Sequence, residues 1–197
     1  MFFRKLPLFL FLMTITACTK TAPVSTGIIP QPNEIYYQQG SFTINDKTVI
    51  VIDSSIHSSL ITTQLTAFLK STFSLELQYA TYAKDNVIHL MKTGQDDGQG
   101  AYSLTVEQQG IFIKAGSDNG IFNGIQTLKQ MLSPQTAITA PILNFVNIND
   151  APEFKWRGMM LDVSRHFVPK DSVKEVIDIL AMHKMNKFHW HLVDGIG

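Results

Sequence analysis

Two polar side chains near the C-terminal end of the chain, Arg165 and Asp194, have types and positions that could do chemistry. Each follows a short apolar segment, residues 158–161 for the arginine and 188–193 for the aspartate. A guanidinium presents a planar fork of donors that can hold two adjacent hydroxyl oxygens. A carboxylate can accept hydrogen bonds from a sugar or orient a histidine. If the segments are neighbouring parallel strands, both side chains emerge at one edge, where barrel enzymes build their active sites.

Two other interpretations of this region stay open from the residues alone. Arg165 could instead form a structural ion pair with a nearby carboxylate such as Asp162. His189 and His191 form a His-x-His pair, whose side chains would point to the same side of a strand and could bind a metal. Because the pair lies inside its segment rather than at the end, we interpret both as packed, hydrogen-bonded histidines and predict no metal site.

The stretch between the two apolar segments predicts a helix. Pro169 and Asp171 supply start signals. Apolar side chains then recur at helical spacing, namely Val173, Val176, Ile177 and Leu180. Lys184 and Lys187 favour the C-terminal end of this helix through its dipole. The order is that of a right-handed βαβ unit, and the continuous apolar run at 158–161 is typical of a parallel strand covered on both faces.

Residues 28–150 are predicted to form a small α+β domain, a sheet with two helices. β-branched runs predict buried strands, a polar turn ending in Gly110 predicts a hairpin, and apolar residues at helical spacing predict the helices. The strands are expected at 48–52, 87–91, 102–106 and 111–115, and the helices at 60–69 and 121–132. Nothing in this unit looks catalytic, so we expect it to support a neighbouring domain, although a sugar-binding module stays open.

The N-terminus has the pattern of a bacterial lipoprotein signal, predicted to span residues 1–18. Arg4 and Lys5 precede an apolar stretch that is shorter than the roughly 20 residues needed to cross a bilayer. The stretch ends at Cys18, the only cysteine, which the lipobox pattern predicts to be acylated as the mature N-terminus. Residues 19–27 would then form a tether. The alternative is an ordinary secretory signal with an incidental cysteine.

These features predict an exported bacterial lipoprotein, in the periplasm or at the outer membrane or cell surface, with a lipid anchor to the membrane. Acidic and basic residues balance at 16 each, and no basic run appears. A nucleic-acid partner is therefore not expected. No cofactor is expected either, and the composition does not indicate an oligomeric state.

Several separated motifs resemble the β-N-acetylhexosaminidases of glycoside hydrolase family 20. RGMMLDVSRHF at 157–167, followed by FHWHLVD at 188–194, is similar to the start of that family's catalytic barrel. IIPQPNEI and DNGIFNGIQTLKQML resemble its smaller N-terminal domain, and APEFKWRG resembles the junction between the two. The resemblance implies that residues 151–197 begin a (β/α)8 TIM barrel, of which this chain would hold the first βαβ unit because a whole barrel needs about 250 residues.

The resemblance also assigns roles to individual residues. Arg165 matches the arginine that grips the non-reducing sugar through its C3 and C4 hydroxyls. Asp194 matches the aspartate that orients a histidine supporting the catalytic acid. Many members continue with a second aspartate, a glutamine and a glycine, whereas this chain continues with residues 195–197, Gly-Ile-Gly.

Family 20 enzymes use a substrate-assisted retaining mechanism, in which the substrate's own acetamido oxygen attacks the anomeric carbon. The family's adjacent Asp-Glu pair is absent from this sequence. We therefore expect an N-terminal portion, ended by truncation or an incomplete gene record and inactive alone, of an exo-enzyme that removes terminal N-acetylglucosamine or N-acetylgalactosamine from glycans. Two other functions stay open: a non-catalytic surface lipoprotein that binds glycans or a partner, and a metal-dependent hydrolase using His189 and His191.

Overall fold

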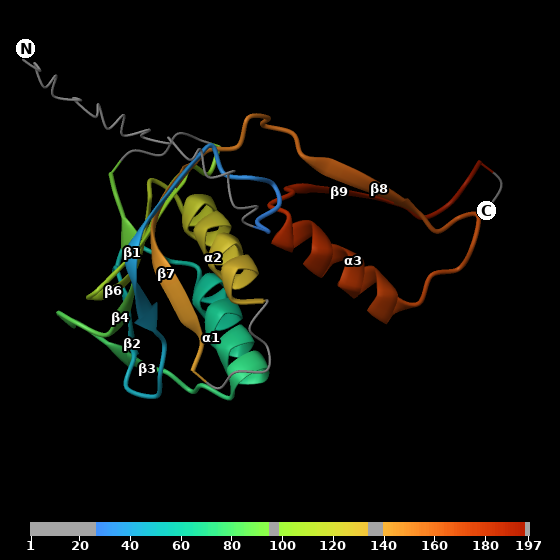
Figure 1. The fold of residues 1–197 in the computed structure, drawn as a ribbon. Helices are drawn as coiled ribbons and strands as arrows, with labels where there is room; N and C mark the ends of the chain where they lie inside the picture. Colours follow the sequence, from blue (N-terminus) through green and yellow to red (C-terminus); the bar gives the residue numbers. More distant parts are fainter. Residues whose placement is uncertain (1–26, 95–98, 134–139, 196–197) are drawn as a thin grey trace, which may run out of the picture.

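A computed structural model of the protein describes residues 27–94, 99–133 and 140–195. Its elements form a seven-stranded mixed sheet with two helices and a separate two-stranded parallel sheet with one helix (Figure 1). In chain order they are β1 (Glu34–Thr43), β2 (Val49–Ile52), α1 (Ser59–Phe73), β3 (Gln78–Ala80), β4 (Val87–Lys92), β5 (Tyr102–Glu107), β6 (Gly110–Ala115), α2 (Asp118–Leu132), β7 (Ile142–Asp150), β8 (Gly158–Asp162), α3 (Lys170–Met182) and β9 (Lys187–His191). No helix within the described ranges is long and apolar enough to cross a membrane. Residues 1–26 lie outside these ranges. They include Cys18, the predicted signal and all but the last residue of the predicted tether.

The large sheet has the strand order β1-β7-β5-β6-β4-β2-β3. Strands β3, β2, β4 and β6 run parallel to one another, and β5, β7 and β1 pair antiparallel along the other half. The four predicted strands, the hairpin and both helices of this domain are confirmed. The sequence did not predict β1, β3 or β7. Strand β1 is mostly exposed and β3 is short, while β7 interleaves three asparagines with its buried residues, and asparagine is depleted in strands.

Helices α1 and α2 cover one face of this sheet (Figure 1). Leu65 and Leu69 of α1 and Ile125 and Leu128 of α2 are fully buried, together with alternate residues of the strands beneath. Ser117 caps α2, because its hydroxyl accepts a hydrogen bond from a backbone amide of the first turn at 3.3 Å. The apolar contact between helices and strands therefore forms the core, and no described helix lies on the opposite face of the sheet.

Gly120 lets α2 approach the sheet closely. A Cβ atom at this position would overlap the carbonyl oxygen of Ala101 and lie 2.6 Å from the Cβ of Ala115. The glycine thus allows the first turn of the helix to lie directly on β5 and β6.

The C-terminal elements form the predicted βαβ unit. Strands β8 and β9 are parallel neighbours, paired from Gly158↔Lys187 to Asp162↔His191, with α3 between them in the chain. The prediction that the second strand extends to Val193 was wrong. The amide of Val163 donates to the carbonyl of His191 at 3.0 Å, and the chain after β8 then turns, so no partner continues the ladder.

The expectation that the first strand of this unit is covered on both faces was also wrong for the described residues. Met159 and Met160, which as successive residues point to opposite faces, are both exposed, so neither face of the strand is fully covered. Figure 1 shows β8 and β9 projecting away from the large sheet beside α3.

A buried lysine joins the two units. The Lys184 side chain is 4% exposed, and its Nζ lies 2.9 Å from Asp150 Oδ2 at the end of β7 and 2.9 Å from the hydroxyl of Tyr102. That hydroxyl donates to Asp150 Oδ2 at 2.9 Å and lies 2.6 Å from Thr127 Oγ1. Burial, with the nearby Asp150 charge, raises the pKa of Tyr102 far above its ordinary range. Arg157, just before β8, donates from Nε to the Lys184 carbonyl at 2.8 Å.

The expectation that Lys184 interacts with the dipole of the preceding helix was wrong. Helix α3 ends at Met182, with His183 as its C-cap. Lys184 then adopts a left-handed conformation with φ of 58°, which reverses the chain and directs the side chain into the core. Burial lowers the pKa of this ammonium group, and Asp150 opposes that effect.

Replacing the buried lysine should destabilise the chain strongly. We expect Lys184→Met to lower the free energy of unfolding by about 3–5 kcal/mol, because Asp150 is left buried without its cation. Urea denaturation measures this change. The matched control is Lys174→Met, at an exposed ion pair on α3, which should change stability by less than about 0.5 kcal/mol. Equal effects of the two variants would contradict the role of Lys184.

Alanine at Gly120 should be destabilising even though alanine normally favours helices. The expected loss is about 1–3 kcal/mol, the usual cost of overpacking, because the new methyl group meets the Ala101 carbonyl. Gly94→Ala is the control, since nothing lies within 4 Å of its added Cβ. Thermal or urea unfolding compares the two, and a stabilised Gly120→Ala would contradict the close approach of α2.

Candidate functional site

Arg165 and Asp194 meet at the carboxyl edge of the two-stranded sheet, as the sequence predicted. Arg165 follows β8 by three residues and Asp194 follows β9 by three, so the parallel pairing brings them together. Nη2 of the guanidinium donates to Oδ2 of the carboxylate at 3.1 Å. Their side chains are 65% and 63% exposed, so this pair is accessible to a ligand from solvent.

Asp162, the last residue of β8, organises the loop that holds the arginine. Its Oδ1 accepts hydrogen bonds from the hydroxyl of Ser164 at 2.7 Å and from the Ser164 amide at 3.0 Å, and lies 3.1 Å from Nδ1 of His191. Its Oδ2 lies 3.9 Å from Nε of Arg165. The ion pair that the sequence left open with Asp162 and the pair with Asp194 are therefore both present.

These contacts stabilise the charged form of Asp162. The hydrogen bond from the Ser164 hydroxyl, followed by those from His191 and from the amides of Ser164 and Arg165, holds the pKa of this carboxyl far below its usual range, against an opposing effect of desolvation. The negative charge of Asp162 then lies beside the guanidinium of Arg165. The sequence did not predict the part played by Ser164, although an aspartate two residues before a serine is typical of such side-chain turns.

The His-x-His pair lies on one side of β9, as predicted, with ring centroids 6.3 Å apart. His191 is half-buried and bonded to Asp162, which fits the interpretation of a packed histidine. His189 is exposed, so that interpretation was wrong for it. Within the part of the chain that the structure describes, no group of three or more His, Cys, Asp or Glu side chains could hold a metal ion.

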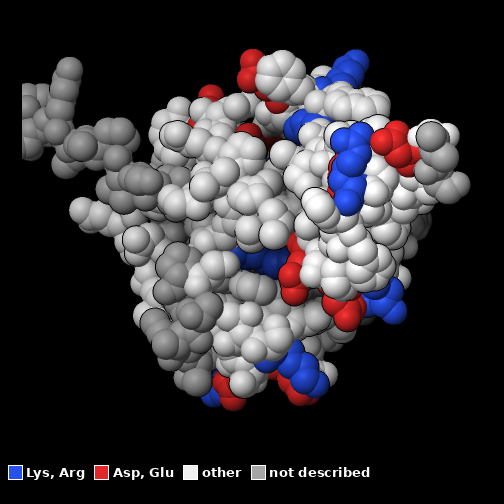
Figure 2. All heavy atoms as spheres, turned by 90° about the vertical axis from the view of Figure 1, so that its right-hand side faces the viewer, with Lys and Arg blue, Asp and Glu red and all other residues white. Residues whose placement is uncertain are grey.

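The arrangement is suited to holding a polar, uncharged group. A guanidinium has five N–H donors in a fixed plane, and here two carboxylates flank it and fix its direction. On the face shown in Figure 2, blue and red side chains are scattered among uncharged ones, without a continuous positive band. The edge therefore presents directed hydrogen-bond donors and acceptors for hydroxyl groups.

Comparison with known proteins places this chain among the glycoside hydrolases. The family model for glycosyl hydrolase family 20, domain 2, matches residues 25–151, and the model for that family's catalytic domain matches residues 154–197. The chain belongs to glycosyl hydrolase family 20.

Curated relatives agree with this assignment. The chain is 32% identical to a beta-hexosaminidase of Porphyromonas gingivalis, over 93% of this chain and 26% of the relative. It is 33% identical to a beta-hexosaminidase of Vibrio furnissii, over 90% of this chain and 28% of the relative. The chain thus spans about a quarter of the length of these relatives.

Solved structures agree as well. An exo beta-N-acetylglucosaminidase of Vibrio harveyi, crystallised with N-acetylglucosamine, superposes with a TM-score of 0.78 and 33% identity, over 87% of this chain and 26% of that one. A Streptomyces plicatus N-acetyl-beta-hexosaminidase gives a TM-score of 0.77 and 32% identity, over 88% and 36%. The mixed sheet with its helices and the following βαβ unit are therefore the architecture of family 20 enzymes.

The lowered pKa of Asp162 predicts a specific pH dependence. A carboxyl whose folded pKa is depressed contributes stability above its unfolded pKa of about 3.9, and this contribution is lost as pH falls toward the folded value. At a pH equal to that unfolded pKa, carbon-detected NMR should show the Asp162 carboxyl still ionised. Ser164→Ala should move its titration upward, because the leading hydrogen bond is removed. Ser172→Ala, on α3, is the control, and ordinary titration of Asp162 in the unaltered chain would contradict the hydrogen-bond network.

Proposed function

We propose that these residues serve an exo-acting β-N-acetylhexosaminidase, which removes terminal N-acetylglucosamine or N-acetylgalactosamine from glycans by a substrate-assisted retaining mechanism. The observation that carries the proposal is the exposed Arg165–Asp194 pair at the carboxyl edge of β8 and β9. The relatives named beta-hexosaminidase and the Vibrio harveyi complex with N-acetylglucosamine support the same substrate class.

In this mechanism Arg165 grips the terminal sugar. Its planar donors match two adjacent hydroxyls, those at C3 and C4, and the flanking carboxylates of Asp162 and Asp194 keep the guanidinium from rotating. Asp194 would also orient a histidine that supports the catalytic acid, as the family resemblance implies. The 2-acetamido oxygen of the substrate attacks the anomeric carbon as the glycosidic bond breaks and the departing oxygen takes a proton from the catalytic acid; water then opens the resulting oxazolinium ion and returns a proton to that residue.

We also propose that β8, α3 and β9 are the first βαβ unit of a (β/α)8 barrel. The match of the catalytic-domain model to residues 154–197 supports this. So do the exposed apolar side chains of Met160 and Trp190, which adjoining barrel elements would bury. Because the 197 residues contain no adjacent Asp-Glu pair, they would bind the sugar without cleaving it.

The location we propose is that of an exported lipoprotein. The N-terminal signal pattern and the small residues before Cys18 support it. A lipid on Cys18 and a tether over residues 19–27 would hold the enzyme at a membrane surface, where glycans outside the cytoplasm are accessible.

Arg165 provides the test of this function. In the complete gene product we expect hydrolysis of 4-nitrophenyl N-acetyl-β-glucosaminide or its galacto analogue. Arg165→Ala should lower kcat/KM by roughly 10²- to 10⁴-fold, because two hydrogen bonds from a charged donor are lost. Arg165→Lys should also be impaired, since an ammonium cannot replace the fork. Lys174→Ala, on the exposed surface of α3, is the matched control.

Three outcomes would contradict the proposal. Inactivity of the complete gene product on both substrates would remove the hexosaminidase function. Full activity of Arg165→Ala would remove the role of the arginine. Nitrophenol release by the 197-residue chain alone, if abolished in Arg165→Ala, would show that these residues suffice for hydrolysis.

A further inference from the structure

The face of the seven-stranded sheet opposite α1 and α2 carries a row of polar side chains. Strand register places Lys114, Ser103, Asn149 and Glu34 next to one another across β6, β5, β7 and β1. Their neighbours along the strands, such as Ile113 and Leu104, are buried toward the helices. Because successive side chains of a strand point to opposite faces, the polar row points away from the core.

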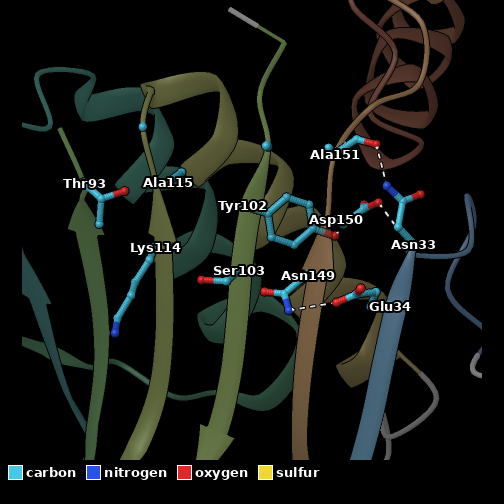
Figure 3. Close-up of a pocket in the computed structure, with 12 residues that line it drawn as sticks. Asn33, Glu34, Thr93, Tyr102, Ser103, Lys114, Ala115, Asn149, Asp150 and Ala151 are labelled. Carbon is cyan, nitrogen blue, oxygen red and sulfur yellow. Dashed lines mark hydrogen bonds between the residues drawn. The ribbon is translucent and has the colours of Figure 1, made fainter. Parts of the chain in front are cut away.

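A shallow pocket of about 620 Å³ lies over this row. Figure 3 shows the four side chains side by side across the strands, with the helices behind them. Asn149 Nδ2 donates to Glu34 Oε2 at 3.2 Å. At the end of the pocket, Asn33 donates from its side chain to the Ala151 carbonyl at 3.2 Å. The four side chains of the row are presented by paired strands, so this part of the pocket is built on a rigid surface.

The chemistry of the row favours a neutral ligand rich in hydroxyl and amide groups. It combines one ammonium, one carboxylate, one amide and one hydroxyl, which together offer both donors and acceptors. An anion would meet Glu34, and a cation would meet Lys114. At about 4.8 Å between strands, the row from Lys114 to Glu34 extends over roughly 14 Å, which suits a short chain of linked units better than a single small molecule.

A second row, two residues further along the strands, contains aromatic rings. Register aligns Phe112, Thr105, Asn147 and Tyr36 across the same four strands. His89 of β4 lies beside Phe112, with ring centroids 6.2 Å apart, and Tyr36 is 60% exposed. The phenol ring of Tyr36 combines an apolar face with a polar hydroxyl, and the phenyl ring of Phe112 adds an apolar face. Sugars have the complementary character, with apolar C–H faces and hydroxyl edges.

We propose that Lys114, Ser103, Asn149 and Glu34 form a second glycan-binding site, the outer-face site, for a neutral oligosaccharide. It is separate from the barrel edge that holds Arg165. Its ligand class rests on the proposed function, because the chain it binds would be the N-acetylated glycan whose terminal sugar the enzyme removes. The outer-face site would hold the glycan at the protein surface between cleavage events.

The test measures binding of N,N′,N″,N‴-tetraacetylchitotetraose to the 197-residue chain by titration calorimetry. Ser103→Trp places a large ring in the pocket without reaching the core and should weaken binding at least tenfold. Glu107→Trp is the matched control, since it lies on the same strand and the same face but does not line the pocket; it should bind as the unaltered chain does. Lys114→Ala, a smaller change, should weaken binding several-fold, and urea denaturation checks that each variant is folded.

Arg165→Ala separates this inference from the proposed function. If the outer-face site exists, this variant loses binding at the barrel edge but keeps the tetrasaccharide binding that Ser103→Trp removes. Loss of binding in Arg165→Ala together with normal binding by Ser103→Trp would overturn the outer-face site and leave the hydrolase proposal standing. Absence of binding by the unaltered folded chain would also overturn it. Binding that depends on Ser103 while the complete gene product fails to hydrolyse either aryl substrate would keep the site and reject the hydrolase.

Discussion

A buried ammonium group, that of Lys184, connects the two parts of this structure. A charge with 4% exposure is stable only when it is paired and hydrogen-bonded, and its partners come from the other part: Asp150 at the end of β7 and Tyr102 at the start of β5. Lys184 lies between α3 and β9, so these bonds set where the βαβ unit begins relative to the sheet. Arg157 strengthens the junction through the Lys184 carbonyl. The positions of Arg165 and Asp194 depend on this arrangement.

At the opposite end of the βαβ unit, charged side chains lie near the surface. Asp162 stays ionised because Ser164 and His191 bond to it, and together with Asp194 it directs the guanidinium of Arg165 outward. The two ends of β8 and β9 thus have different tasks. The amino end anchors the unit by buried polar bonds, and the carboxyl end offers exposed, oriented groups to a ligand.

The large sheet shows a similar division between its faces. Helices α1 and α2 cover one face (Figure 1), which is buried by aliphatic side chains, while the other face presents amide and hydroxyl groups (Figure 3) and the rings of Phe112 and Tyr36. The proposed outer-face site would give this domain a binding role beside the one proposed for Arg165.

The sequence by itself determined much of this protein. The spacing of apolar residues predicted α1, α2, α3 and most buried strands. The polar residues that follow the two C-terminal apolar segments predicted that Arg165 and Asp194 share an edge. It did not predict β1 and β7, whose polar composition hides strands that only pairing stabilises. It assigned Lys184 to the helix dipole, and it gave no sign of the row from Lys114 to Glu34. These features join residues up to 115 positions apart, and only tertiary structure decides such contacts, because local propensity carries no information about which distant charge or strand becomes a neighbour.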